Sequence, residues 1–109
     1  MSDPARELAR LRALCPGAEL WQEAGAPLVY LPGLQVESAG VLHPVDALLC
    51  PRERDSYETR LFLSVQLPKA INWTLAIVMA RTWHVASWRG IAADQPWLDI
   101  LGAHLEAVK

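Results

Sequence analysis

The densest group of chemically capable side chains lies between Arg81 and Gly90. The sequence there is Arg-Thr-Trp-His-Val-Ala-Ser-Trp-Arg-Gly, which brings together hydroxyls, an imidazole and two guanidinium groups. A serine hydroxyl needs a neighbouring base to become a nucleophile, and cations stabilise the negative charge that develops when it attacks a carbonyl group. Ser87 is therefore a candidate nucleophile and His84 its base, with Arg81 or Arg89 as the stabilising cation.

The simpler interpretation of this segment is an aromatic strand packed on the core, with its arginines at the strand ends. On a regular strand His84 and Ser87 point to opposite faces, so a hydrogen bond between them needs a turn or a bulge. Trp83, Trp88 and Arg89 are candidate binding residues, because tryptophan and arginine are enriched at interface hot spots. Exposed indole rings would favour an interface, and buried rings would favour the core.

Neither cysteine is a good candidate nucleophile. Cys50 ends an apolar stretch and precedes a proline, and Cys15 lies on the apolar edge of a predicted helix. Both thiols are therefore expected to be buried and inert. The histidines are widely separated and no glycine-rich phosphate loop is present, so we expect no metal and no cofactor. The histidines are His43, His84 and His104.

The elements that must position these residues begin with a helix over 3–15, which a proline-glycine pair ends. A hairpin over 19–31 follows, and then an alternating strand at 34–37. A turn at Pro32-Gly33 is expected to separate them. The apolar run 45–50 is typical of a central strand that is buried on both faces.

The charged segment 51–56 has two arginines against one glutamate and one aspartate, which indicates a solvated hairpin tip rather than a recognition patch. A strand over 57–65 and extended structure with an internal turn over 71–88 follow. A second helix begins near Asp94, a suitable N-cap, and carries an apolar stripe over 97–108. This order predicts an α+β fold in which an antiparallel meander is covered on one face by a helix from each end.

Length and composition indicate one domain, 1–109. The net charge of −2 argues against a sequence-independent nucleic-acid binder, which needs a basic surface. No signal peptide is apparent, and the longest apolar run, 75–80, is far shorter than the roughly 20 residues of a membrane span. Two cysteines cannot form a dense disulfide framework. We therefore expect a soluble cytoplasmic protein that binds no membrane.

Several pieces, taken in order, point to a family. They are the Leu-Arg-Ala-Leu end of the first helix and the segments 28–32, 45–51, 57–63 and 81–87, followed by the helix after Pro96. Their spacing over most of the chain resembles the small bacterial proteins of the ubiquitin-conjugating-enzyme (UBC) type. Such proteins are encoded beside ubiquitin-like modifiers, activating-enzyme-like proteins and JAB-type metalloproteases. The resemblance implies a UBC-like fold with a helix, a four-stranded antiparallel meander and a C-terminal helix.

The resemblance also implies a function in a bacterial ubiquitination-like pathway, of the kind found in antiphage defence. The protein would receive or position a ubiquitin-like modifier from an activating-enzyme-like partner. Conjugating enzymes of the familiar kind carry His-Pro-Asn and then a catalytic cysteine after the fourth strand. This chain has His43-Pro44-Val45 before the central strand, and no cysteine follows Cys50. Any transfer would therefore proceed without a cysteine at the usual place.

Three functional interpretations follow. The protein relays the modifier, through an oxyester on Ser87 or a non-covalent handover. Alternatively it is a non-catalytic adaptor in a hetero-oligomer, binding the modifier or the activating enzyme through the arginine-rich face of the first helix. Thirdly, it is an unrelated α+β module whose tryptophan-rich segment binds a partner protein.

Overall fold

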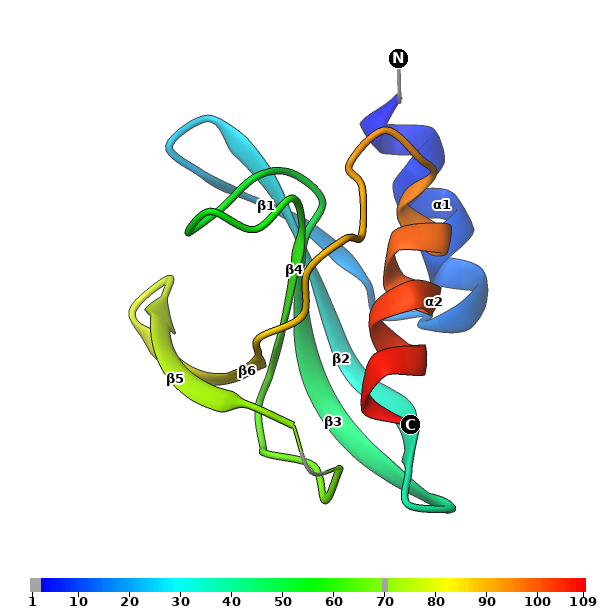
Figure 1. Ribbon diagram of the computed structural model, residues 1–109. Helices are drawn as coiled ribbons and strands as arrows, with labels where there is room; N and C mark the ends of the chain where they lie inside the picture. Colours follow the sequence, from blue (N-terminus) through cyan, green and yellow to red (C-terminus); the bar gives the residue numbers. More distant parts are fainter. Residues whose placement is uncertain (1–2, 70) are drawn as a thin grey trace.

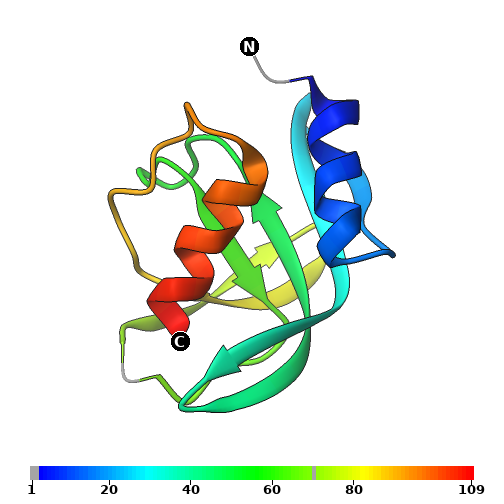
Figure 2. The same ribbon diagram turned by 90° about the vertical axis from the view of Figure 1, so that its right-hand side faces the viewer.

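The computed structural model describes residues 3–69 and 71–109, in which six antiparallel strands form one sheet in the order β1-β2-β3-β4-β6-β5. The two helices lie side by side on one face of this sheet (Figures 1 and 2). The helices are α1 (Pro4–Leu14) and α2 (Trp97–Val108). The strands are β1 (Glu19–Glu23), β2 (Ala26–Ser38), β3 (Val41–Cys50), β4 (Arg60–Leu63), β5 (Trp73–Val78) and β6 (Arg81–Ala86). The predicted α+β class is confirmed.

The prediction of a four-stranded meander is wrong, because the sheet has six strands. The predicted turn at Pro32-Gly33 is also wrong. It is an irregularity within β2, where the register with β3 shifts between Leu31 and Leu34. A bulge of this kind bends a strand without ending it. The extended segment 71–88 forms a complete hairpin, β5–β6, which adds two strands at one side of the sheet.

Two-residue turns shape the hairpins. Ala24-Gly25, Ala39-Gly40, Asp55-Ser56 and Met79-Ala80 each have positive φ at both positions. This backbone twist matches that of the flanking strands, which is why such turns favour tight hairpins. Two of the turns contain no glycine, and L-residues are strained in this conformation.

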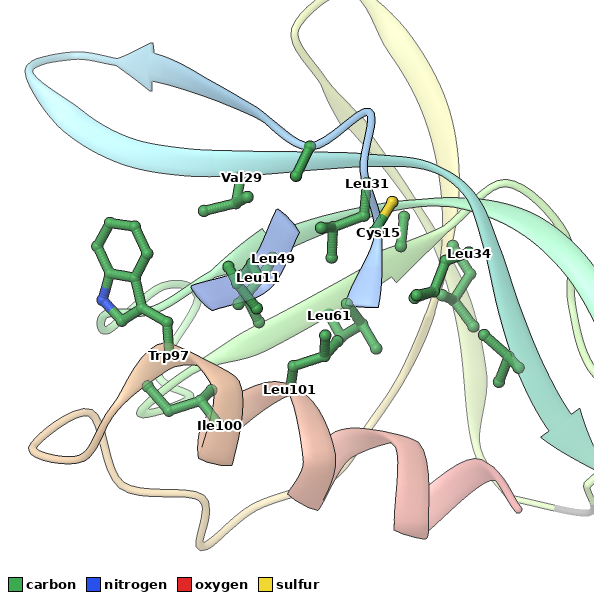
Figure 3. Packing of buried hydrophobic residues seen from close by; sticks show 14 of the residues in the cluster. Leu11, Cys15, Val29, Leu31, Leu34, Leu49, Leu61, Trp97, Ile100 and Leu101 are labelled. Carbon is green, nitrogen blue, oxygen red and sulfur yellow. The ribbon is translucent and has the colours of Figure 1, made fainter. Parts of the chain in front are cut away.

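The main core lies between the helices and the sheet, as Figure 3 shows for side chains that converge from α1, α2 and the strands. Leu11, Leu31, Leu49, Ile100 and Leu101 are all fully buried there. The burial on both faces predicted for the central strand 45–50 is confirmed, because all its residues are buried apart from the half-buried Asp46.

A second, smaller core fills the other face of the sheet, where the β5–β6 hairpin curves away from the helices (Figure 1). Phe62 and Trp83 are its largest side chains. The Trp83 indole N–H donates to the Val78 carbonyl oxygen at 3.1 Å, which satisfies its polar atom inside this core. The hairpin is therefore attached to the sheet by packing as well as by backbone pairing.

Glu7 of α1 caps α2. The Trp97 backbone N–H donates to Glu7 Oε2 at 2.5 Å, and the Glu7 side chain is buried. The predicted cap at Asp94 is wrong, because the residue before the helix is Pro96, which offers no side-chain cap. The carboxylate from α1 supplies the acceptor that a helix N-terminus requires, and its charge is favourable there.

Within the described ranges, neither helix has the length and apolar character needed to cross a membrane.

Candidate functional site

Strand β6 separates the two residues that the sequence predicted to act as a nucleophile and base. Trp83 and Val85 face the smaller core, so His84 and Ala86 face the opposite side of the sheet. His84 lies opposite Leu63 of β4 and Leu75 of β5. The strand is regular from Arg81 to Ala86, with no turn or bulge that could bring His84 to Ser87. The predicted Ser87–His84 pair is therefore wrong.

The side chain beside Ser87 is instead that of Tyr57. Ser87 directly follows β6, and its backbone N–H donates to the Asn72 carbonyl oxygen at 2.8 Å, which extends the hairpin register by one more pair. The Ser87 side chain lies near enough to the Tyr57 phenol to lower its pKa. Both residues are only partly buried. A hydroxyl pair accessible to a partner molecule therefore lies at the end of β6.

A tight turn presents Tyr57 to this position. Arg54 and Tyr57 exchange two backbone hydrogen bonds of 2.9 Å across the Asp55-Ser56 turn. The predicted solvated hairpin tip is confirmed, since both turn residues are exposed. The tip also has a structural function that the charge pattern did not reveal, because it fixes the position of an aromatic ring.

Two guanidinium groups lie over the Tyr57 ring. Arg60 Cζ is 4.1 Å and Arg89 Cζ 4.3 Å from its centroid, within the range of a cation–π contact. Arg89 also donates to the Ser56 carbonyl oxygen at 3.0 Å, and Arg60 Nη1 to Asp55 at 3.1 Å. These contacts hold both cations beside the phenol. We call Ser87, Tyr57, Arg60 and Arg89 the hydroxyl site.

The environment of the hydroxyl site lowers the pKa of Tyr57. The largest cause is the neighbouring Ser87 hydroxyl, and the positive charges of Arg89 and Arg60 act in the same direction. A phenol made more acidic in this way loses its own proton more readily, and the phenolate that results can accept a proton from a neighbouring hydroxyl. The arrangement can thus polarise the Ser87 hydroxyl and stabilise negative charge on an attached or approaching group.

Arg81 has no part in this site, contrary to the sequence prediction. It begins β6, whereas Ser87 follows the end of that strand, a separation of up to about 20 Å at roughly 3.3 Å per residue. Its guanidinium group donates to Asp46 at 3.2 Å and lies 4.4 Å from the centroid of the Trp83 ring. These contacts place Arg81 on the surface, where its guanidinium group covers the Trp83 ring of the smaller core.

The two candidate tryptophans differ. Trp83 is fully buried, so its predicted binding role is wrong and the core interpretation applies. Trp88 is 42% exposed and lies in the chain between Ser87 and Arg89, with Trp73 and His104 among its neighbours on the helix side of the sheet. A half-exposed indole is typical of a contact residue.

Both cysteines are buried and free, as predicted. Burial raises the pKa of each thiol, which keeps it protonated at neutral pH. Their S–H groups donate to the Pro32 carbonyl oxygen at 3.2 Å and to the Arg52 carbonyl oxygen at 3.5 Å. Among the residues that the structure describes, no three His, Cys, Asp or Glu side chains gather as a metal would require.

Comparison with protein-family models, curated proteins and solved structures finds no match to this chain. The hydroxyl site is therefore interpreted from its own geometry. Sequence reasoning found Ser87 and Arg89 but missed Tyr57 and Arg60. One signal was available for Arg60: the alternation of a strand places it on the same face as Phe62, and its Cζ lies 5.7 Å from the centroid of that ring.

Proposed function

We propose that this protein is a UBC-like acceptor that receives a ubiquitin-like modifier on Ser87 from an activating-enzyme-like partner. The observation that carries the proposal is the partly exposed Ser87 hydroxyl beside the Tyr57 phenol, whose pKa is lowered, with Arg89 and Arg60 over the phenol ring. This arrangement stands after Cys50, the last cysteine of the chain, and so provides an oxygen nucleophile in place of a thiol.

The proposed reaction transfers one acyl group, the modifier's C-terminal carbonyl, from a sulfur atom to the Ser87 oxygen. The Ser87 oxygen attacks the carbonyl carbon of the modifier's C-terminal thioester on the activating enzyme. The hydroxyl proton passes to the oxygen of Tyr57 in its phenolate form. The carbon–sulfur bond then breaks, and the departing thiolate receives that proton from Tyr57. The product is an oxyester on Ser87. Arg89 stabilises the oxyanion that forms between attack and departure.

The fold offers limited support for the family assignment. Both helices cover one face of an antiparallel sheet, and they come from the two ends of the chain, as the UBC resemblance implies. The added β5–β6 hairpin departs from a four-stranded meander. The same hairpin brings Ser87 close to Tyr57. The part of the fold that differs from a four-stranded meander is therefore also the part that forms the hydroxyl site.

The test is reconstitution with the cognate ubiquitin-like modifier and activating enzyme, together with ATP. We expect an adduct that withstands thiol reagents but is cleaved by hydroxylamine, and that is absent from Ser87→Ala. Tyr57→Phe keeps the ring under both arginines and should slow adduct formation at least tenfold. Thr82→Ala, which removes an exposed hydroxyl elsewhere on β6, is the matched control and should react normally.

The second candidate function is a non-catalytic adaptor, and the exposure of Trp88 favours it. In that case the protein binds the modifier or the activating enzyme without forming an adduct, and Trp88→Ala weakens the complex while Ser87→Ala does not. Binding to neither protein would refute both candidate functions.

A further inference from the structure

We propose that β5 is an association edge, which pairs antiparallel with β5 of a second copy of this chain. The proposal does not depend on the function proposed above. Strand β5 is the last strand at one side of the sheet (Figure 1), so one of its backbone edges has no strand beside it in the described structure. An unpaired edge offers a row of N–H and C=O groups to another strand.

The hairpin geometry identifies which backbone groups are free. In a two-residue hairpin the residues that flank the turn, here Val78 and Arg81, exchange both hydrogen bonds, and every second pair does the same. The hydrogen bond from the Ser87 N–H to the Asn72 carbonyl oxygen agrees with this pattern, because Asn72 and Ser87 form the next hydrogen-bonded pair in the same register. The N–H and C=O groups of Trp73, Leu75 and Ile77 therefore point outward.

The side chains of the same strand make this edge apolar. Leu75 is 65% and Ile77 76% exposed. Both lie on the same face of the sheet as His84, and neither helix extends over this part of that face (Figure 1). Strand β5 contains no charged residue and no proline. The opposite edge strand, β1, by contrast has a charged residue at each end, Glu19 and Glu23. Natural edges are protected against pairing by charges, prolines or bulges, and β5 has none of these.

A second copy fits this edge because antiparallel pairing is its own complement. With the two-fold axis at Ala76, each Leu75 lies opposite Ile77 of the other copy, and the outward groups of both residues form the hydrogen-bonded pair. Cross-strand pairs of this kind are the unit of sheet stabilisation. The strand is uncharged, so two copies meet without like-charge repulsion. One strand pair buries less than a standard interface, so we expect a micromolar, concentration-dependent dimer.

Sedimentation velocity from about 1 μM to about 1 mM tests the association. Ile77→Lys places a charge opposite Leu75 of the other copy and should weaken dimerisation at least tenfold. Leu42→Lys is the matched control, since Leu42 is similarly exposed (62%) but lies on β3, and it should dimerise like the wild type. A monomer throughout this range, or a dimer that Ile77→Lys leaves unchanged, would overturn the proposal.

A disulfide tests the register. Ala76 lies at the two-fold axis in a non-hydrogen-bonded pair, where Cα atoms about 4.5 Å apart suit a disulfide. Oxidised Ala76→Cys should therefore form a covalent dimer. Thr74→Cys is the control, because its counterpart would lie about 13 Å along the strand and should not cross-link. Equal cross-linking of both variants would refute this register.

Amide hydrogen exchange gives a readout without substitution. The amides of Leu75 and Ile77 should become protected as the protein concentration rises, while that of Ala76, already bonded to β6, should change little. Association without new protection of these two amides would contradict strand pairing.

Discussion

We expect the protein to lose stability as the pH falls through the range in which an ordinary histidine takes up a proton, and His104 is the reason. Its side chain is buried on α2, and its Nε2 lies 2.9 Å from Thr59 Oγ1. The Thr59 hydroxyl donates its own hydrogen to the Ile91 carbonyl oxygen at 2.8 Å. His104 Nε2–H must therefore donate to Thr59, which assigns the neutral tautomer with its proton on Nε2.

The size of the effect follows from the pKa. Burial first, and then the positive charge of Arg60, lower the pKa of His104 from 6.5 to about 4. The unfolded chain binds a proton below pH 6.5, whereas the folded chain does not until about pH 4. Protons thus favour unfolding in this window. The contribution of His104 is complete above pH 6.5 and falls by about 3 kcal/mol by pH 4.

Urea unfolding at a series of pH values measures this change. Other groups also titrate, so the comparison is with His104→Gln, whose amide keeps an N–H donor for Thr59 but does not take up a proton. The difference in unfolding free energy between the wild type and His104→Gln should shrink as the pH is lowered from about 7 to about 4. A difference that stays constant across this range would refute the assignment of a buried, neutral His104.

Three further changes have defined expected results in urea unfolding of dilute protein. Replacing Met79-Ala80 by Asn-Gly should stabilise the protein by about 1 kcal/mol, because both residues have positive φ; no gain would contradict this strain. Glu7→Ala should cost about 1–2 kcal/mol, since it removes the acceptor for the Trp97 N–H, and a neutral result would show that water replaces it. Leu101→Ala, in the fully buried core, should cost about 2–5 kcal/mol, and a loss below 1 kcal/mol would contradict the packing.

The elements that are specified by local pattern were predicted well. The apolar spacing of α1 and α2, the alternation at 34–37 and the apolar run at 45–50 each depend on residues that are neighbours in sequence. The failures arose where local signals are ambiguous. Pro32-Gly33 indicates a turn by composition, but pairing with β3 on both sides keeps the strand continuous. Asp94 is a suitable cap by type, but Glu7, distant in sequence, occupies the position.

The residues of the hydroxyl site also fall into two groups, those that local sequence indicates and those that only strand pairing brings together. Ser87 and Arg89 were found because they are near one another in the chain, and the alternation rule already warned that His84 would face away from Ser87. Tyr57 and Arg60 were missed, because their proximity to Ser87 and Arg89 requires β4 to pair with β6 across the intervening segment. No local spacing records that pairing.

The sequence by itself determined the α+β class, the burial of both cysteines and the two sides of each strand, since side-chain polarity and a period of two or 3.6 residues act locally. Only the tertiary structure decided which side chain accompanies Ser87, because strand order sets which distant segments become neighbours. Tertiary structure likewise left β5 as an uncharged outer edge, since a strand is an edge only when the sheet ends beside it.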